Sequence, residues 1–307
     1  MAGETTSTEW IAVDWGTSNL RVWIIGADGH PFATETSDQG MGTLQNDGFE
    51  AALLDLIEPY LVAERAMPVV CCGMVGSRQG WAEAAYLSVP SRPPNGQAAT
   101  SVSAKDPRIA VSILPGIKQI TPPDVMRGEE TQIAGFLQGN PDFDGVICLP
   151  GTHTKWVHIS AQEIVSFQTF MTGEMFALLS KQSVLRHSVG SDGFDQSAFD
   201  AAVADAMDRP QLLASKLFGL RAGSLVADLD PLTARSRLSG LLIGAELAGA
   251  RPYWLGQNVA IIGDSAVAEP YRLGLAAQGV NASTFDVADL TLRGLSAARR
   301  SLKECSS

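Results

Sequence analysis

Short apolar runs broken by turn residues predict strands at the start of the chain. Two such runs cover Trp10–Asp14 and Leu20–Ile25, and the Asp28-Gly29 turn signal leads into a third extended segment. From Phe49 to Ala66 the apolar positions recur at helical spacing, and Pro59 predicts a kink or break within that segment. Further predictions are strands over Pro68–Cys72 and Ile109–Leu114, and a helix that opens with acidic residues over Glu129–Leu137.

The same succession of patterns begins again after residue 145. Three short apolar runs predict strands, helices follow, and another buried strand precedes two more helices. The order β-β-β-α-β-α therefore occurs twice, with helical insertions in the second copy, which indicates internal duplication. The predicted segments are strands Val146–Leu149, Lys155–Ile159, Ile164–Phe170 and Val259–Ile262, and helices Glu174–Leu185, Pro231–Ala248, Glu269–Ala277 and Asp289–Lys303, with helical pieces between Ala198 and Leu220.

This duplication predicts an α/β protein of two domains, residues 1–140 and 141–307. The length of 307 residues agrees, because a domain typically takes roughly 150 residues. We expect the hinge near residues 138–145, where Gly139, Pro141 and Gly145 cluster. The long apolar helix that ends near Ala248 serves either the core or a homodimer interface.

The two copies share a turn at the tip of a predicted hairpin. Residues 14–19 (DWGTSN) join two strands and precede Arg21 and Trp23, while residues 150–154 (PGTHT) join two strands and precede Lys155 and Trp156. A Gly-Thr tip exposes backbone N–H groups that suit anionic oxygens, although Gly also marks ordinary tight turns. The pair of turns, taken with Asp14, favours phosphate binding. The candidate phosphate ligands are Gly16, Thr17, Ser18, Asn19, Arg21, Gly151, Thr152, His153 and Thr154, with His153 as a turn donor.

Asp14 lies at the end of a predicted buried strand and is the candidate magnesium residue. One carboxylate commonly holds Mg²⁺ through water at a nucleotide site. A third turn, Gly263-Asp264-Ser265, follows the strand Val259–Ile262. It either accepts a ribose or flat ring at the carboxyl end of the strand, or is a simple loop with Ser265 as the N-cap of the next helix.

Composition excludes several classes of partner. The net charge is −11, so the chain lacks the basic surface that nucleic acids and anionic membranes attract. No apolar run approaches the roughly 20 residues that span a bilayer. Met1–Trp10 has no basic or apolar leader region, so we expect a cytoplasmic protein. Four cysteines without a Cys-x-x-Cys spacing predict neither a disulfide framework nor structural zinc, and Cys71, Cys72 and Cys148 read as small buried hydrophobes.

Several ordered motifs together resemble the 2-dehydro-3-deoxygalactonokinase family of the actin–hexokinase superfamily. The resemblance runs from about residue 10 to 300 and is carried by residues 12–21, 73–81, 125–132, 149–156, 172–174 and 238–246. In that superfamily the turns at 14–19, 151–152 and 263–265 correspond to the first phosphate, second phosphate and adenosine motifs.

The resemblance implies two ribonuclease-H-like (actin-like ATPase) domains around a cleft, with the final helix 289–303 packing back on the first domain. It also implies ATP and Mg²⁺ as cofactors. The implied reaction is transfer of the γ-phosphoryl group to the 6-hydroxyl of 2-dehydro-3-deoxy-D-galactonate, in galactonate breakdown by the De Ley–Doudoroff route.

A kinase needs a base near the attacking hydroxyl, and such a base contributes about 10²–10⁴-fold to the rate. The candidates are Glu129 and Glu130, which open the predicted helix; adjacent helical residues point about 100° apart, so one of them faces the substrate. Related enzymes place an acidic residue at the start of the corresponding helix, and by that likeness we prefer Glu130 and keep Glu129 second. The alternative is that both acids only stabilise the helix dipole. Asp14 is the third catalytic candidate.

The substrate carries a carboxylate, so an acidic enzyme must supply a local cation. Arg suits a carboxylate because its guanidinium fork binds both oxygens. Arg127, beside the glutamates, is preferred over Arg78 and Arg21, either as the clamp of the carboxylate or as the partner of the glutamates. The glycine-rich loop 73–81 predicts the acceptor pocket through Gly76, Ser77 and Trp81. Trp81 and Trp15 either wall the cleft or belong to the core, where tryptophan is more common.

Three other activities stay open on the same fold. The enzyme could phosphorylate the gluconate epimer of the sugar acid, because the two compounds differ at a single hydroxyl. It could hydrolyse phosphoanhydrides, in which case ATP loss would need no sugar acid. It could bind nucleotide as a sensor without turnover.

Overall fold

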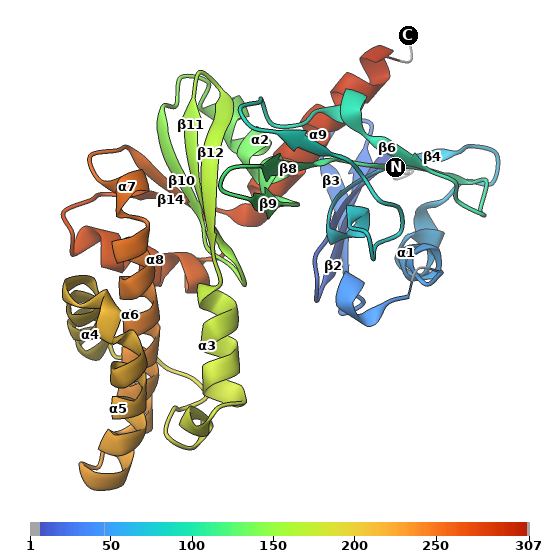
Figure 1. Cartoon of the computed structure of the whole chain (residues 1–307). Helices are drawn as coiled ribbons and strands as arrows, with labels where there is room; N and C mark the ends of the chain where they lie inside the picture. Colours follow the sequence, from blue (N-terminus) through green and yellow to red (C-terminus); the bar gives the residue numbers. More distant parts are fainter. Residues whose placement is uncertain (1–6, 46, 306–307) are drawn as a thin grey trace, which may run out of the picture. The chain divides into compact units, whose positions relative to one another are not determined.

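The computed structural model describes residues 7–45 and 47–305, and residues 1–6, on which the expectation of no leader partly rests, lie outside it. The chain divides into two compact units (Figure 1). Unit 1 comprises Met1–Phe143, Gln162–Ile164 and Val287–Ser307, and unit 2 comprises Asp144–Ala161 and Val165–Asp286. Each unit is built around a mixed sheet with helices, as expected for a ribonuclease-H-like domain, and unit 1 carries a small second sheet. No helix within the described residues is long and apolar enough to cross a bilayer.

Unit 1 is built on a six-stranded sheet of order β3-β2-β1-β4-β7-β6. Strand β1 pairs antiparallel with β2 and parallel with β4, so β1 and β4 end at the same edge of the sheet. The predicted hairpin and its neighbouring strand are therefore confirmed. The strands are β1 (Thr8–Trp15), β2 (Leu20–Gly26), β3 (Pro31–Ser37), β4 (Met67–Gly73), β6 (Thr100–Val102) and β7 (Ile109–Ile113).

Both faces of this sheet are buried, because alternate residues of a strand point to opposite sides. Ile11 and Val13 of β1 pack with Phe49 and Leu53 of α1 (Phe49–Ile57) on one face. On the other face, the neighbouring β1 residues Trp10 and Ala12 pack with Leu295 and Ala298 of α9 (Val287–Cys305). Cys71 and Cys72 of β4 are fully buried on opposite faces, and Cys148 is fully buried in unit 2, as predicted.

Helix α1 is shorter than its apolar pattern predicts. It ends at Ile57, and Pro59 lies in a 3-10 turn over Glu58–Tyr60. Proline has no N–H to continue the helix, so the predicted break at Pro59 is confirmed, and the helical spacing that runs on to Ala66 does not form a helix there.

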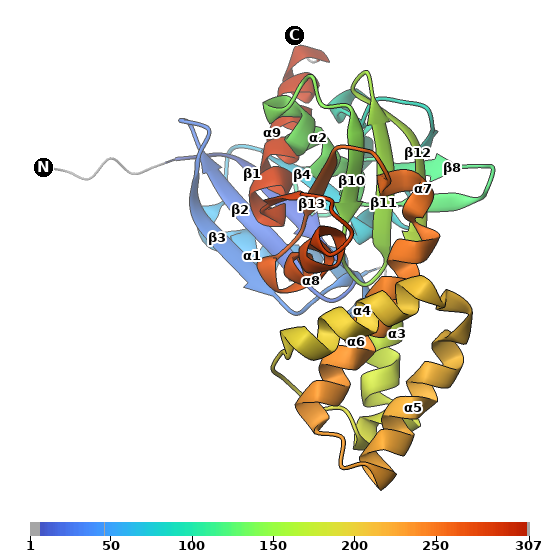
Figure 2. The ribbon, with the colours of Figure 1, turned by 90° about the vertical axis from the view of Figure 1, so that its left-hand side faces the viewer.

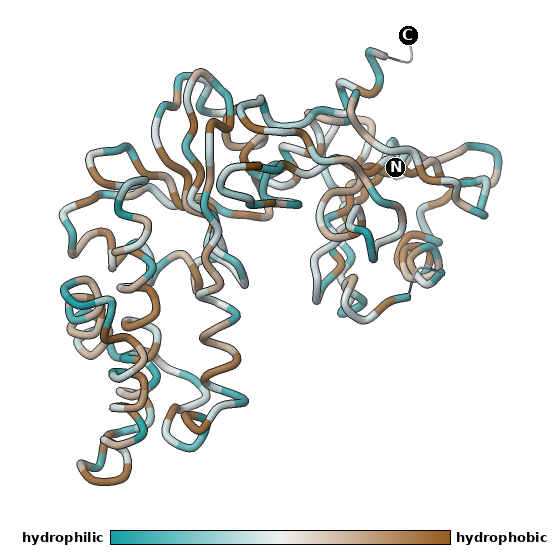
Figure 3. The backbone as a smooth tube through the Cα atoms, in the orientation of Figure 1, coloured by the Kyte–Doolittle hydropathy of each residue, from teal (hydrophilic) through white to brown (hydrophobic). Residues whose placement is uncertain are grey.

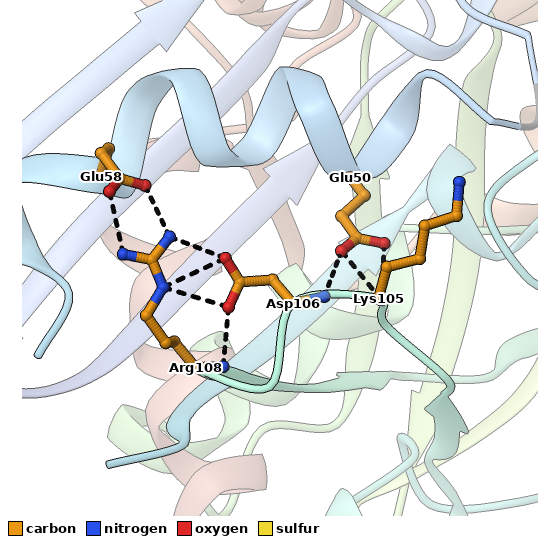
Figure 4. Close-up of polar contacts among 5 residues, drawn as sticks. All are labelled: Glu50, Glu58, Lys105, Asp106 and Arg108. Carbon is orange, nitrogen blue, oxygen red and sulfur yellow. Dashed lines mark hydrogen bonds and ion pairs between the residues drawn. The ribbon is translucent and has the colours of Figure 1, made fainter. Parts of the chain in front are cut away.

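A polar network ties the loop before β7 to α1 (Figure 4). The Glu50 carboxylate accepts hydrogen bonds from the backbone N–H groups of Lys105 and Asp106, at 2.7–2.9 Å. Arg108 forms ion pairs with Glu58 at 2.9 Å and with Asp106 at 2.7 Å. Exposed ion pairs contribute little each, so the buried face of α1 supplies most of the attachment.

A small sheet of order β5-β8-β9, which the apolar pattern did not predict, lies between β4 and α2 in the sequence. Its strands are β5 (Tyr86–Ser88), β8 (Gly116–Gln119) and β9 (Asp124–Met126). Strand β9 ends at Met126, and Arg127 and Gly128 lead directly into α2 (Glu129–Gly139). This sheet therefore positions the start of the acidic helix.

Unit 2 repeats the pairing of unit 1. Its sheet has the order β12-β11-β10-β13-β14, with β10 antiparallel to β11 and parallel to β13. Hydrophobic stretches follow its strands in Figure 3, and the helices α3–α6 gather at one end of the sheet in Figure 2. The elements are β10 (Gly145–Leu149), β11 (Thr154–Ser160), β12 (Glu163–Phe170), β13 (Val259–Ile262), β14 (Ser283–Phe285), α3 (Thr172–Lys181), α4 (Gln196–Asp208), α5 (Leu213–Val226), α6 (Pro231–Gly249), α7 (Arg251–Trp254) and α8 (Ser265–Ala276).

Helix α6 serves the core of unit 2. Ile243 and Leu247 pack with the sheet, while Leu238 and Leu241 pack with α4 and with Leu220 of α5. The predicted apolar helix, for which the sequence left core or interface open, therefore buries its apolar residues within unit 2.

Helices α2 and α9 cross at very short range in unit 1, side by side in Figure 1. A Cβ added at Gly294 of α9 would collide with the backbone carbonyl of Thr131, and one added at Gly135 of α2 would collide with that of Leu290. The crossing therefore needs glycine on both helices. It packs α9 against Thr131, the residue that follows Glu130.

We expect Gly294→Ala to destabilise unit 1 by about 1–3 kcal/mol, because the added methyl group must displace a backbone carbonyl. Gly139→Ala is the matched control on α2, because the nearest atom to its added Cβ is a side-chain nitrogen of Arg293 at 3.7 Å. Urea unfolding followed by circular dichroism measures both. Equal stability of the two variants would contradict the tight crossing.

Candidate active site

The first predicted turn, residues 16–19, lies at the tip of the β1–β2 hairpin. Thr17, Ser18 and Asn19 are exposed, and the Gly16 N–H donates to the Asn19 carbonyl at 2.9 Å. The segment that follows β3 braces the turn from behind: the Gly42 N–H donates to the Thr17 carbonyl at 2.8 Å. The turn thus keeps a fixed shape while its side chains face solvent.

Asp14 lies two residues before this turn, opposite Arg21 in the β1–β2 register. Its Oδ1 is 3.8 Å from the Cys72 thiol, which donates to it. Burial raises the pKa of Asp14, while the positive charge of Arg21 opposes that shift. No group of three or more His, Cys, Asp or Glu side chains within residues 7–45 and 47–305 could hold a metal ion. A magnesium ion at Asp14 would therefore take most of its ligands from water and substrate phosphates.

Glu129 and Glu130 open α2 with their carboxylates turned back on the preceding backbone. The Gly128 N–H donates to both oxygens of Glu130, at 2.8 and 2.9 Å, and the Arg127 N–H donates to Glu129 at 3.0 Å. Gly128 has φ +112°, a conformation that suits glycine. These bonds satisfy donors at the helix start, as the dipole-stabilising alternative requires.

The two glutamates differ in exposure. Glu130 is 0% exposed, whereas Glu129 is partly exposed. Burial, together with the charge of Glu129, raises the pKa of Glu130 to about 7. Glu130 and Asp14 both act electrostatically on the Cys72 thiol, and Glu129 acts on Asp14. Gly73, the last residue of β4, lies between these groups: a Cβ added there would be 3.5 Å from Asp14 Oδ1, and one added at Gly128 would be 3.4 Å from the Gly73 Cα. The structure therefore places Asp14 and the segment that carries Glu129 and Glu130 on either side of the end of β4.

Arg127 is 8% exposed, and Ala84 and Tyr86 hold its guanidinium group. Its Nη2 donates to the Ala84 carbonyl at 2.8 Å, and its guanidinium lies 4.2 Å from the centre of the Tyr86 ring. Arg127 Nη1 has no hydrogen-bond partner among the described residues, and neither has the buried Ser77 Oγ. A Cβ on Gly76 would lie 2.8 Å from this buried Nη1, so glycine there leaves room for the guanidinium group.

The other candidates around the acceptor loop divide into packing and surface residues. Trp15 is 0% exposed, and its indole N–H donates to the Gln39 carbonyl at 3.0 Å. Of the two alternatives for Trp15, the structure therefore confirms the core residue and not the cleft wall. Trp81 packs edge-to-face on Trp15, with ring centres 6.3 Å apart, and keeps partial exposure. Arg78 is exposed and pairs loosely with Glu83 at 3.6 Å.

The second predicted turn, at Gly151–His153, lies between β10 and β11 of unit 2. Thr152 and His153 are exposed, and the Glu174 N–H donates to the Thr152 carbonyl at 2.9 Å. A Cβ at Gly173 would collide with the Gly151 carbonyl, so α3 begins directly against the turn. His153 Nε2 lies 2.6 Å from the Glu174 carboxylate.

Thr154 was predicted as a phosphate ligand, and its placement corrects that prediction. It is 0% exposed, and its hydroxyl lies 2.7 Å from the Tyr271 hydroxyl, inside the unit. The alternation of side chains along β11 turns it away from the tip.

The third turn adjoins a cavity of about 960 Å³ in unit 2. Gly263 is buried, and its N–H donates to the Phe285 carbonyl at 3.1 Å. Helix α8 starts at Ser265 with Asp264 in the N-cap position, so Ser265 is not the cap. Ser265 lines the cavity together with Gly151 and Thr152, which means that the second and third turns share one cavity. Further lining residues include Thr172, Gly173, Phe176, Phe194, Arg235 and Tyr271.

Sequence reasoning assigned no role to two buried charged residues of unit 2. Lys155 is 5% exposed, and its Nζ donates to the His153 carbonyl at 3.0 Å, which places a cation at the second turn. Glu246 of α6 is 3% exposed and accepts hydrogen bonds behind the cavity. The signals in the sequence were the place of Lys155 after the second turn, matching Arg21 after the first, and the isolated charge of Glu246 within an apolar stretch.

Comparison with known proteins gives consistent matches along the chain. A family model described as 2-keto-3-deoxy-galactonokinase matches residues 14–298. A Rhizobium meliloti (strain 1021) protein named "Probable 2-dehydro-3-deoxygalactonokinase DgoK1" is 38% identical over 97% of this chain and 99% of its own. The Escherichia coli (strain K12) 2-dehydro-3-deoxygalactonokinase is 34% identical over 89% and 91%. A crystal structure from Sinorhizobium meliloti, described as a proposed 2-dehydro-3-deoxygalactonokinase, has a TM-score of 0.88 and 38% identity over 95% of this chain and 99% of that one.

Proposed function

The chain belongs to the 2-keto-3-deoxy-galactonokinase family, and from that premise we propose that it transfers the γ-phosphoryl group of ATP to the 6-hydroxyl of 2-dehydro-3-deoxy-D-galactonate. The relatives that carry this enzyme name cover nearly the whole chain. The observation that supports the chemistry best is the cluster of Asp14, Glu129 and Glu130 at one strand end of unit 1. The reaction belongs to galactonate breakdown.

The cavity of unit 2 is the proposed ATP site. Its volume of about 960 Å³ suits a ligand of nucleotide size, since such pockets range over about 300–1,000 Å³. Gly151 and Thr152 present an open backbone tip for phosphate oxygens. Lys155 adds positive charge next to that tip. Phe176 and Phe194 supply apolar surface for the base.

Asp14 is the proposed Mg²⁺ residue, through water. Bound Mg²⁺ would neutralise charge that develops on the transferred phosphoryl group. Gly16, Thr17, Ser18 and Asn19 next to Asp14 would contact phosphate oxygens from an exposed turn of fixed shape. Within the described residues, no cluster of protein ligands offers a second metal site.

Glu130 is the proposed general base that accepts the proton of the 6-hydroxyl. A pKa of about 7 suits this role, because a base works best when its pKa lies near the operating pH. Since Glu130 is 0% exposed, a hydroxyl reaches it only when the segment around Gly128 opens. Glu129 needs no such opening and is the second candidate.

Arg127 and Ser77 are the proposed ligands of the sugar-acid carboxylate. A buried guanidinium nitrogen and a buried hydroxyl without hydrogen-bond partners are costly, unless a ligand satisfies them. Arg127 is already fixed by Ala84 and Tyr86, so its free edge is oriented before the substrate arrives. The absence of a side chain at Gly76 leaves room for that edge.

Cytoplasmic ATP and a small sugar acid are the proposed partners, without nucleic acid. The net charge of −11 disfavours binding along a nucleic-acid backbone, which needs an extended basic surface. A homodimer is consistent with the exposed apolar residues Phe218, Leu225 and Val226 of α5.

The product of the reaction tests the proposed substrate. Protein, Mg²⁺-ATP and 2-dehydro-3-deoxy-D-galactonate are expected to give a phosphate monoester on C6, detected by ³¹P and ¹³C nuclear magnetic resonance. The gluconate epimer, measured alongside, is expected to react at least about tenfold more slowly, since one misplaced hydroxyl leaves a polar group of the site unpaired. Faster reaction of the gluconate compound would replace the proposed substrate by its epimer.

Glu130→Gln is expected to lower kcat by at least about 10²-fold while ATP still binds, because the amide cannot accept the proton. Wild-type kcat should rise with pH through about 7 as Glu130 loses its proton. Glu129→Gln is the matched variant, with an expected loss under tenfold. Steady-state kinetics from pH 5.5 to 9 measure both; a large loss in Glu129→Gln alone would move the role of base to Glu129.

Arg127→Lys is expected to raise KM for the sugar acid by about tenfold or more with little change in KM for ATP. Lysine keeps the charge but loses the fork that binds two carboxylate oxygens. Thermal unfolding checks that the buried site still folds, and Arg78→Lys, on the exposed part of the same loop region, is the control. An unchanged KM in a folded Arg127→Lys protein would remove Arg127 from the acceptor site.

A further inference from the structure

Glu246 is a buried carboxylate that the proposed reaction does not use. It lies on α6 behind the cavity and is 3% exposed. Trp156 Nε1 of β11 donates to its Oε1 at 2.8 Å, and the Tyr271 hydroxyl of α8 hydrogen-bonds its Oε2 at 2.7 Å. The Thr172 side chain of α3 makes a further hydrogen bond to it.

The partners of Glu246 belong to the elements that form the cavity. Thr172 and Tyr271 line it directly, and Thr172 precedes Gly173, which packs against the second turn. The Tyr271 hydroxyl also lies 2.7 Å from the hydroxyl of Thr154, the first residue after that turn. One carboxylate therefore connects both sides of the turn with α8.

We propose that Glu246 is a positioning residue of the nucleotide site, which orients the second turn, the start of α3 and helix α8 through Thr172, Tyr271 and Thr154. This role rests on the proposed binding of ATP in the cavity. This positioning role is distinct from catalysis, because Glu246 does not line the cavity and does not belong to the carboxylate cluster of unit 1.

The role requires a carboxylate. An indole N–H can only donate, so Oε1 must accept from Trp156. With Glu246 ionised, Tyr271 donates to Oε2 and Thr154 in turn donates to Tyr271. An amide or a protonated carboxyl at position 246 carries a donor of its own, which must reverse the Tyr271–Thr154 bond or leave one donor unpaired. Charge at Glu246 thus fixes the direction of the chain of hydrogen bonds that ends beside the turn.

Protonation of Glu246 supplies a readout that simple packing would not. Burial raises its pKa to about 7, although hydrogen bonds from Thr172, Trp156 and Tyr271 oppose the shift. The titratable groups that face it are Cys148 of β10 and Tyr271 of α8, and burial raises the pKa of each. Trp156 of β11 and Thr172 of α3 do not titrate. The carboxylate form is therefore lost as the pH falls through about 7.

Glu246→Gln in the full-length protein tests the proposal. We expect Kd for a non-hydrolysable ATP analogue, measured by calorimetry at pH 8, to rise roughly tenfold, as loss of one well-placed buried hydrogen bond implies. KM for ATP should rise in parallel, while KM for the sugar acid changes less than twofold. Asp208→Asn, an exposed carboxylate of unit 2 paired with Arg209, is the control and should match the wild type.

The pH dependence and a second variant separate positioning from stability. The ratio of Kd between Glu246→Gln and wild type should be largest at pH 8 and approach one at pH 6, where the wild type is itself protonated. Tyr271→Phe interrupts the same chain, so the double variant should be less impaired than the product of the single effects. Trp156→Phe, which removes one donor, serves if Glu246→Gln does not fold, with a smaller rise in Kd expected.

Two different failures can be told apart. A wild-type protein that does not bind the analogue would overturn the proposed ATP site itself. A wild type that binds it, with Glu246→Gln and Trp156→Phe binding equally well or with a Kd ratio independent of pH, would overturn the positioning role alone.

Discussion

Parallel pairing of two strands is the constraint on which each unit depends. Strand β4 lies parallel to β1 in unit 1, and β13 lies parallel to β10 in unit 2. Parallel neighbours end at the same edge of their sheet, so the loops that follow them meet there. In unit 1 this edge sets Gly73 of β4 beside Asp14, and Gly128, which precedes the two glutamates, packs against Gly73 from the small sheet's side. In unit 2 this edge gathers the Gly151 and Ser265 turns around one cavity.

Each unit also buries one glutamate at this edge, and each satisfies it in a different way. Glu130 accepts from the backbone of Gly128, whereas Glu246 accepts from side chains of three other elements. An isolated buried carboxylate would be strongly unfavourable, so such donors must be kept in place by the surrounding packing. That requirement links the site of each unit to its core: α9 holds α2 beneath Glu130, and α6 carries Glu246 among buried leucines.

The sequence pattern predicted the features that depend on local rules. The hairpin of β1 and β2, the repeated strand order and the two Gly-Thr turns follow from alternation of apolar residues and from turn chemistry. The pattern did not predict strands β5, β8 and β9, because they are three or four residues long and lie among Gly and Pro. The sequence pattern could not predict that three side chains are buried, because burial depends on which elements pack around them. These residues are Trp15, Thr154 and Glu246.

Release of ADP by the purified protein, with and without 2-dehydro-3-deoxy-D-galactonate, tests the central claim most directly. Mg²⁺-ATP alone should give almost no ADP, and addition of the sugar acid should start steady turnover. This result would identify a kinase whose chemistry waits for the acceptor hydroxyl. ADP release at the same rate without any sugar acid, or nucleotide binding with no turnover in either case, would contradict the account and leave a hydrolase or a sensor on this fold.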